Sequence, residues 1–316
     1  MDYSILIDQT LTNLGIKFQP EYSAYNTQRS DRTGWSLKLP DLLPDHYLLL
    51  HFQDYVTWQN NAVVELQTIE QRYGAQANRV IVTHWNHNLS KHYSGPVTLI
   101  EFSSHNYGTA MSLQKIQPVW DGILQSTRSG WQCLNGRYDQ HRRRAVDILK
   151  SWPNGTLSYG TQLNLDQASY ANYFECNNEQ NFIRLMPVYG RHAINIVTET
   201  IYRDPGIMTE KTMMAMAAEQ IPIVIGHQGI VQDCRDLGFD MFDDLVDTSY
   251  DTLPNDSRVE QALLRNQHLI TSNIDLLPYR ARLCAQREFL LNRFSEQIAQ
   301  RFVTQCTALA KKLGAF

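Results

Sequence analysis

The stretch "GIMTEKTMMAMAAEQIPIVIG", residues 206–226, contains the signals that decide the fold. Thr209 is a favourable helix N-cap, and the apolar, Met-rich run after it predicts a helix over 210–220. The next residues, IPIVIG at 221–226, form a short apolar run that ends in glycine and is typical of a buried strand. HAINIVTET at 192–200 predicts a strand before the helix. A strand, a helix and a strand in this order indicate a βαβ unit with parallel strands.

The same alternation recurs along the chain. Further strands are predicted at 46–52, 79–85, 96–102, 131–136 and 156–160, a short strand or turn at 238–242, and helices at 5–14, 63–74, 141–150 and 229–237. From 256 onward the pattern is mostly helical, with candidate breaks at Asn273 and Pro278. The sequence therefore predicts an α/β protein with two Rossmann-like, doubly wound domains that face a cleft, followed by a helical C-terminal tail.

The first group of predicted strands ends and the second begins between residues 110 and 130, and this sets the predicted domain boundaries. We expect an N-terminal domain over 1–125, a C-terminal domain over 126–275 and a tail over 276–316. The tail either packs back on the N-terminal domain or forms a dimer contact, and the sequence leaves the oligomeric state open.

Composition excludes several classes of protein. Hydrophobic residues make up 43% of the chain and charged residues 19%, which is typical of a globular protein with a sizeable core. The net charge of −4 argues against a dedicated nucleic-acid binder, which is usually basic. The chain has no apolar run long enough to span a membrane and no basic segment typical of a signal peptide. The five widely spaced cysteines favour free thiols, so we expect a cytoplasmic protein.

Glu210 and Lys211 lie at the predicted helix start, where physical chemistry suggests a function. Unpaired N–H groups and the helix dipole favour anions there, and Lys211 adds a full positive charge beside the hydroxyl of Thr212. Glu210 would repel a phosphate, but its carboxylate accepts hydrogen bonds from sugar hydroxyls. Lys211 and Glu210 together fit the diphosphate and the ribose of a nucleotide. The alternative is a solvated helix start in which Glu210 only favours the dipole.

Residues 131–260 resemble the nucleotide-sugar-binding half of α-1,3-fucosyltransferases and of related glycosyltransferase-like proteins of tailed phages. The resemblance rests on V-T-E-T at 197–200, T-E-K-T at 209–212, and the later L-G-F, F-D-D and S-Y-D elements. WQCLNGRYDQHRRRAVDIL at 131–149 is similar to a second element of the phage proteins, C-L-N-x-R-x-x-x-H-R. Residues 1–125 carry no resemblance and are expected to hold the acceptor.

This resemblance implies a GT-B fold with the donor bound mainly by the C-terminal domain. It implies contacts from Lys211 to the donor diphosphate and from Glu210 to the ribose or base. The full set of implied donor-binding residues is Arg137, His141, Arg142, Glu199, Thr209, Glu210, Lys211 and Thr212. The chain has T-E-T at 198–200 where fucosyltransferases have F-E-N, so the resemblance does not predict which nucleotide the donor contains. The alternatives to phosphate binding for the basic run 137–144 are a solvated helix face and a surface that binds nucleic acid.

An inverting transfer also needs a general base on the acceptor hydroxyl. Asp54 and Glu101 are equal candidates because each follows a predicted strand of the N-terminal domain, and His105 comes shortly after. His84, His87 and His92 have no regular metal-ligand spacing, and the sequence contains no D-x-D triplet. We therefore predict no metal and no cofactor.

The predicted function is the transfer of a sugar from a nucleotide-diphosphate donor to a hydroxyl of a glycan or a lipid-linked sugar. One alternative is a phage DNA glycosyltransferase that acts on a hydroxymethylated pyrimidine, in which case the protein works in the host cytoplasm. A second alternative is a non-catalytic protein that binds a nucleotide sugar. Neither the sugar nor the acceptor follows from the sequence.

Overall fold

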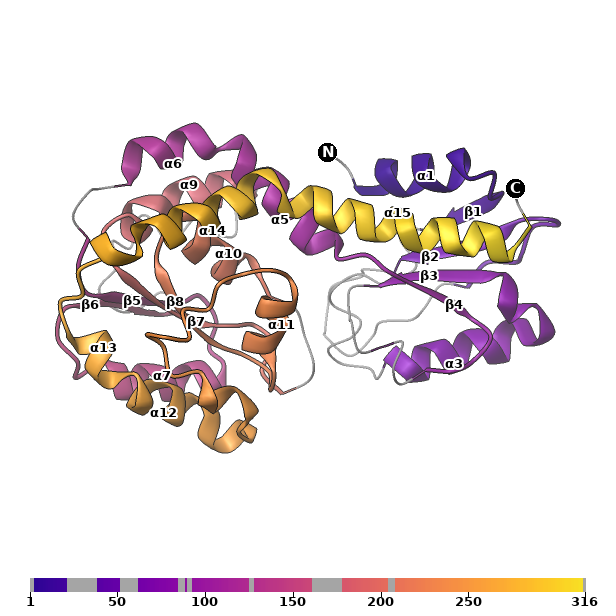
Figure 1. Cartoon of the computed structure of the whole chain (residues 1–316). Helices are drawn as coiled ribbons and strands as arrows, with labels where there is room; N and C mark the ends of the chain where they lie inside the picture. The colour runs from indigo at the N-terminus through magenta and orange to yellow at the C-terminus, as the bar shows by residue number, and fades with distance from the viewer. Residues whose placement is uncertain are drawn as a thin grey trace. The chain divides into compact units, whose positions relative to one another are not determined.

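A computed structural model describes residues 3–21, 39–51, 62–84, 89, 93–124, 128–160, 178–203 and 208–314. The chain divides into two compact units (Figure 1). Unit 1 comprises residues 1–108 and 296–316, and unit 2 comprises residues 109–295. The boundary between the units lies after residue 108, whereas the sequence predicts a boundary after 125. Residues 276–295, predicted as part of the tail, belong to unit 2.

Unit 1 is built on a parallel four-stranded sheet in the order β1-β2-β3-β4. Its strands are β1 (Phe18–Glu21), β2 (Tyr47–His51), β3 (Val80–His84) and β4 (Thr98–Glu101). Its helices are α1 (Tyr3–Asn13), α3 (Ala62–Tyr73) with the 3-10 turn η1 (Gly74–Arg79), the first residues of α5 (Ser104–Lys115) and most of α15 (Phe294–Lys312). Strands β2, β3 and β4 and helix α3 confirm the predictions for 46–52, 79–85, 96–102 and 63–74, whereas β1 and α5 were not predicted.

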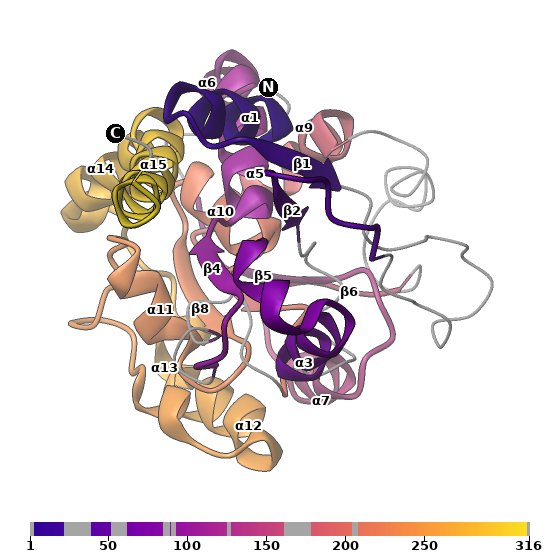
Figure 2. The ribbon, with the colours of Figure 1, turned by 90° about the vertical axis from the view of Figure 1, so that its right-hand side faces the viewer.

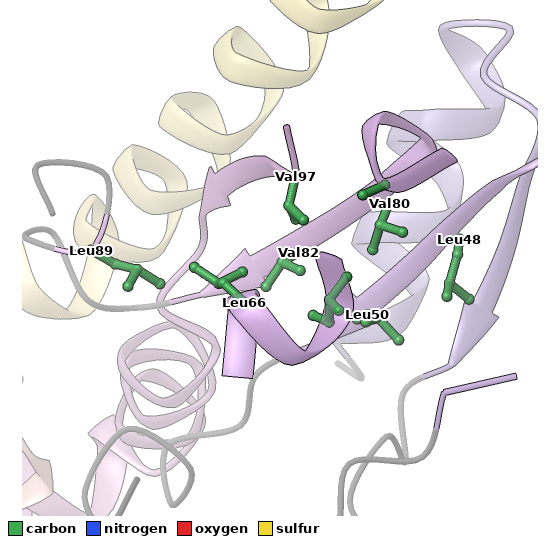
Figure 3. Packing of buried hydrophobic residues seen from close by; sticks show 9 residues of the cluster. Leu48, Leu50, Leu66, Val80, Val82, Leu89 and Val97 are labelled. Carbon is green, nitrogen blue, oxygen red and sulfur yellow. The ribbon is translucent and has the colours of Figure 1, made fainter. Parts of the chain in front are cut away.

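The sheet of unit 1 is buried on both faces. Leu66 and Ile69 of α3 pack with alternate residues of β2 and β3 in one cluster (Figure 3). Its members are Leu48, Leu50, Leu66, Ile69, Ala77, Val80, Val82, Leu89 and Val97. Leu49 and Ile81 point to the opposite face, because side chains alternate along a strand, and they are also fully buried. Helix α1 lies on that side of the sheet and α3 on the other (Figure 2). This two-sided burial explains the unbroken apolar runs of the strands.

Unit 2 is built on a second parallel sheet, in the order β6-β5-β7-β8. Its strands are β5 (Trp131–Asn135), β6 (Gly155–Tyr159), β7 (Ile194–Thr198) and β8 (Ile221–Ile225). Helices α7 (Gln140–Leu149) and α12 (Asn255–Arg265) cover one face, and α9 (Asn178–Tyr189), α10 (Glu210–Ala217) and α14 (Arg280–Asn292) cover the other (Figure 1). The remaining elements are α6 (Gln117–Ile123), α11 (Ile230–Asp236), η2 (Ser249–Thr252), α13 (Gln267–Thr271) and η3 (Leu277–Tyr279).

The strand order of unit 2 contains a switch point. From β5 the chain passes through α7 to β6 on one side, and β7 lies on the other side of β5. Backbone pairing of β5 with β7 involves only Trp131 with Ile194 and Gln132 with Asn195, whereas β7 and β8 pair along their whole length. The two central strands therefore lose their pairing toward their carboxyl ends, which is the place where open parallel sheets bind ligands.

The described part of the chain contains no helix that is long and apolar enough to cross a membrane. The segment 238–242, predicted as a short strand or turn, forms no strand; it begins at Gly238 with the turn that ends α11. Helices α6 and α9 were not predicted, and α9 contains Pro187, which weakened its helical pattern. The architecture is thus α/β with two Rossmann-like halves, each on a four-stranded parallel sheet, and helices at the C-terminus.

Candidate functional site

The carboxyl ends of β5 and β7 are joined by side chains instead of backbone pairing. The Thr198 hydroxyl donates a hydrogen bond to the side-chain carbonyl of Asn135, and both residues are buried. The backbone N–H of Asn135 is held in turn by the Ser158 hydroxyl of β6, at 2.9 Å. These bonds set the positions from which the following residues, Gly136 and Glu199, leave the sheet.

Glu199 is fully buried directly after β7, and its carboxylate holds the start of α10. One oxygen accepts from the Thr209 backbone N–H at 2.9 Å and from the Thr212 hydroxyl at 2.6 Å, and the other accepts from the Thr209 hydroxyl. Thr209 is the N-cap of α10, as predicted. Since Glu199, Thr209 and Thr212 satisfy one another inside the protein, we assign them the positioning of α10; their contact with a donor stays a prediction.

Lys211 and Glu210 lie beside this buried group and are partly exposed. The Lys211 ammonium donates to the Thr200 hydroxyl at 3.0 Å, the Thr209 hydroxyl at 3.3 Å and the Glu210 carboxylate at 2.7 Å. The two side chains of the ion pair are 20% and 21% exposed. The ammonium therefore sits at the carboxyl end of β7, with all three of its protons donated.

Thr200 was not predicted, and it connects Lys211 to a second cation. Its hydroxyl oxygen also accepts from Arg142 of α7, at 3.2 Å. Arg142 is 1% exposed and lies 3.2 Å from the Asp139 carboxylate, and its buried Nε has no hydrogen-bond partner among the described residues. Two cations from different helices thus converge on one neutral oxygen at the switch point.

His141 fixes the loop after β7 from the other side. Its Nε2 donates to the Glu199 carbonyl at 2.9 Å, and its ring stacks on Tyr202 with 4.5 Å between centroids. Burial, helped by the nearby Arg142 charge, lowers the pKa of His141 to about 4, so the ring is neutral at pH 7. We assign His141 the positioning of this loop, because its ring is neutral and its Nε2 proton is donated to a carbonyl; its contact with a donor stays a prediction.

Arg258 of α12 also supports this loop, and the sequence did not indicate it. Its guanidinium is fully buried, donates to the carbonyls of Leu253, at 3.0 Å, and Gly226, and lies 5.2 Å from the Tyr202 ring centroid. No local motif marks this residue, because its partners come from separate loops. Arg137, by contrast, is half-buried in the loop after β5 and makes no hydrogen bond or ion pair with the described residues.

At the carboxyl end of β8, the start of α11 is already bound by a carboxylate of the protein itself. One oxygen of Asp251 accepts from the backbone N–H groups of Val231 and Gln232 at 3.0 and 3.2 Å, at the start of α11. Burial raises the pKa of the Asp251 carboxyl, and these bonds oppose the shift. The start of α11 therefore already carries an anion. At the switch point, Lys211 and Arg142 each have a partly exposed carboxylate partner, Glu210 at 2.7 Å and Asp139 at 3.2 Å.

The predicted general bases belong to unit 1. Asp54 lies outside the described residues, and Glu101 is half-buried at the carboxyl end of β4, with its backbone bonded to the Gln305 side chain. Next to this edge His51 bonds to the Thr83 hydroxyl at 2.7 Å and to the Ser104 hydroxyl at 3.1 Å. Burial and the nearby His84 lower the pKa of His51 to about 4. No sequence motif indicated His51, which is a polar residue inside a buried strand.

Among the residues that the structure describes, no group of three His, Cys, Asp or Glu side chains is placed to hold a metal ion. His84 lies at the end of β3, and His87 and His92 fall outside the described residues. Cys133, Cys234, Cys284 and Cys306 are free thiols.

Comparisons of the chain with protein-family models, with curated proteins and with solved structures found no match.

Proposed function

We propose that this protein is a glycosyltransferase of the GT-B type, which transfers a sugar from a nucleotide-diphosphate donor bound on unit 2. One observation carries the proposal: Lys211 and Arg142 donate to the same Thr200 oxygen at the switch point of a parallel sheet. Their carboxylate partners, Glu210 and Asp139, are partly exposed to solvent, so an anionic oxygen placed between the two cations lowers their mutual repulsion further.

A diphosphate suits this arrangement chemically. Arg142 has a buried Nε–H to offer, Lys211 sits in the first turn of α10, and the helix dipole adds partial positive charge. The half-buried Arg137 follows the neighbouring strand and supplies a third cation. In the proposed reaction these groups stabilise the negative charge that develops on the leaving diphosphate, so the reaction needs no metal ion.

The proposed transfer is inverting. The acceptor hydroxyl attacks the anomeric carbon, a base takes the hydroxyl proton, and the bond to the diphosphate breaks with its electron pair on the leaving oxygen. Asp54 and Glu101 are the proposed bases, so unit 1 is expected to bind the acceptor. The proposed acceptor is a glycan or a lipid-linked sugar, because the net charge of −4 disfavours a nucleic-acid acceptor.

Calorimetric titration tests the donor site. UDP, GDP, CDP and ADP, each in EDTA, are titrated into the wild type, Lys211→Ala and Lys150→Ala. Lys150 is the matched control because it forms an exposed Lys–Asp pair with Asp147 at the other end of α7. We expect one nucleotide to bind, and Lys211→Ala to weaken it about 10- to 100-fold, since a hydrogen bond to a charged group contributes about 1.5–3 kcal/mol.

Turnover separates the enzyme from a binding protein. With the matching nucleotide sugar, release of the nucleoside diphosphate in the presence of a glycan acceptor supports the proposal. A nucleotide that binds without any release, on the whole acceptor panel and in slow hydrolysis, would favour a non-catalytic binding protein. Transfer to hydroxymethylated DNA, with binding that weakens steeply in salt, would identify the phage DNA enzyme instead.

A further inference from the structure

Buried polar side chains gather at the carboxyl edge of the sheet in unit 1. His51 is the last residue of β2 and pairs in register with Thr83 of β3. Ser103 and Ser104 follow β4, where α5 begins, and Asn106 lies in the first turn of this helix. All five side chains are buried. These five residues, which we call the polar edge, lie where open parallel sheets bind ligands, and none of them belongs to the proposed donor site.

The hydrogen bonds of His51 fix the direction in which the Ser104 hydroxyl points its proton. The Thr83 hydroxyl donates to the Leu50 carbonyl at 3.4 Å, so its oxygen accepts from Nδ1 of His51 at 2.7 Å. Burial lowers the pKa of His51 to about 4, so at pH 7 the ring is neutral and carries one proton. Its Nε2 therefore accepts from the Ser104 hydroxyl at 3.1 Å. The Ser104 oxygen is left available only as an acceptor.

Two more oxygens of the polar edge have no partner. Ser103 is the N-cap of α5, because its carbonyl accepts the first helical bond from the Tyr107 N–H at 2.9 Å. The Ser103 Oγ and the Asn106 Oδ1 are buried, yet neither has a hydrogen-bond partner among the described residues. Helical side chains lean toward the start of their helix, so both atoms lie at the same end of α5. Buried polar atoms of this kind are rare, and a bound molecule accounts for them.

The chemistry of these oxygens selects the bound molecule. The oxygens of Ser104 and Asn106 accept hydrogen bonds, and the Ser103 hydroxyl both accepts and donates. An anion such as sulfate brings only acceptors, and a cation would be buried beside groups that carry no charge, which costs free energy. A hydroxyl group donates and accepts, so it fits each of the three. Several hydroxyls close together on one neutral molecule are typical of a sugar.

We infer that Ser103, Ser104 and Asn106 form a binding site in unit 1 for the hydroxyl groups of a neutral sugar. His51 is a positioning residue, because it orients the Ser104 hydroxyl. The role of this sugar as the acceptor rests on the proposed function. Sugar binding itself needs no nucleotide, so it is tested separately from the donor site.

The test uses the full chain and saturation-transfer NMR, in which magnetisation of the protein passes to the protons of a bound ligand. The probes are the methyl glycosides of glucose, galactose, mannose and N-acetylglucosamine, without nucleotide. We expect at least one glycoside to bind the wild type. An equal concentration of sulfate is expected to leave it bound, because sulfate offers acceptors only.

Two variants with matched controls locate the site. Asn106→Leu removes the polar amide at nearly constant volume and is expected to weaken glycoside binding about tenfold or more, since a sugar hydroxyl then loses its partner inside the protein. Ser103→Ala is expected to weaken it about three- to tenfold. Asn13→Leu, at an exposed position of α1, and Ser112→Ala, further along α5, make the same changes outside the polar edge and are expected to leave binding unchanged.

The melting temperature without sugar distinguishes a binding role from a structural one. The Asn106 Oδ1 and the Ser103 Oγ bond to none of the described residues, so their removal breaks no hydrogen bond within this part of the chain. We expect Asn106→Leu and Ser103→Ala to melt at or above the temperature of the wild type, because a buried polar group without a partner destabilises the folded state. Loss of a working N-cap bond would lower it instead.

Each outcome decides the matter. The inference is overturned if no glycoside binds the wild type, if binding survives in both variants, or if sulfate displaces the sugar. A lower melting temperature of Asn106→Leu without sugar would also overturn it, because Asn106 would then serve the fold. The proposed donor site fails separately, if no nucleoside diphosphate binds to a chain that still binds the glycoside.

Discussion

Replacement of Glu199 tests whether a buried carboxylate holds the proposed site together. The Thr209 N–H, the Thr209 hydroxyl and the Thr212 hydroxyl all donate to this side chain, which is fully buried. In Glu199→Ala these donors lose their acceptor in the interior, and a cavity forms. Each unsatisfied buried group costs about 1–3 kcal/mol, and hydroxyl rotation recovers part of this. We expect a loss of about 3–5 kcal/mol in the free energy of unfolding of unit 2.

Three variants calibrate this value. Glu199→Gln keeps one carbonyl oxygen and is expected to cost about 1–3 kcal/mol, because one charge-assisted bond is lost. Thr212→Val removes one of the three donors and is expected to cost about 1 kcal/mol. Glu179→Ala removes a carboxylate from the exposed pair with Lys115 and is expected to cost no more than about 1 kcal/mol.

The assay is hydrogen exchange of the amides in 208–217, followed by mass spectrometry, together with urea unfolding. Exchange reports on α10 itself, so it stays informative if the two units unfold separately. Protection of α10 is expected to fall in the order wild type, Thr212→Val, Glu199→Gln, Glu199→Ala. If Glu199→Ala protected α10 as well as Glu179→Ala does, the bracing role assigned to Glu199 would be refuted.

Three other predictions follow from single residues. Between pH 8 and pH 5 unit 2 should lose about 2 kcal/mol through His141, since its folded pKa of about 4 lies below its ordinary 6.5 and the unfolded state takes up the proton first. This contribution of His141 is complete above pH 6.5 and is lost as the pH falls toward 4. Unfolding midpoints of His141→Gln should therefore depend less on pH than those of the wild type, and an equal pH dependence of the two proteins would contradict the prediction. Arg258→Lys should cost about 3 kcal/mol or more, because an ammonium cannot reach the carbonyls of both Leu253 and Gly226; a wild-type melting temperature would disprove it. Gly130→Ala should cost about 2 kcal/mol or more in the same melting experiment, because φ is +67° and the new Cβ would lie 2.0 Å from the Asn154 carbonyl oxygen; Gly229→Ala, with φ +91° and open space, isolates the backbone part.

The strands were predictable because of where they lie in the fold. Strands β2, β3, β7 and β8 are buried on both faces, so they read as mostly apolar runs of the right length. Strand β1 has the sequence FQPE, in which proline and two polar residues hide the pattern, and it forms by pairing with β2 alone. An edge strand pairs on one side only, so its own sequence is less constrained.

The residues of the candidate site also fall into those that the sequence located and those that it missed. Thr209, Glu210 and Lys211 are contiguous, and the N-cap rule located them correctly at the start of α10. Glu199, chosen as a donor ligand, has its carboxylate occupied by two threonines, and burial of this kind is a property of the packed loop. Thr200, Tyr202 and Arg258 were missed because what distinguishes them is contact with residues far away in the chain.

The sequence by itself determined the alternation of strands and helices, the parallel sheets and the helix start at Thr209, because these depend on periodicity and on residues close together in the chain. Only the tertiary structure decided that β7 lies beside β5 opposite β6, and so which loops meet at the switch point. It also decided that Lys211 and Arg142, 69 positions apart in the printed sequence, share the Thr200 hydroxyl. Strand order sets such meetings, and it depends on the packing of the whole sheet, which no local pattern encodes.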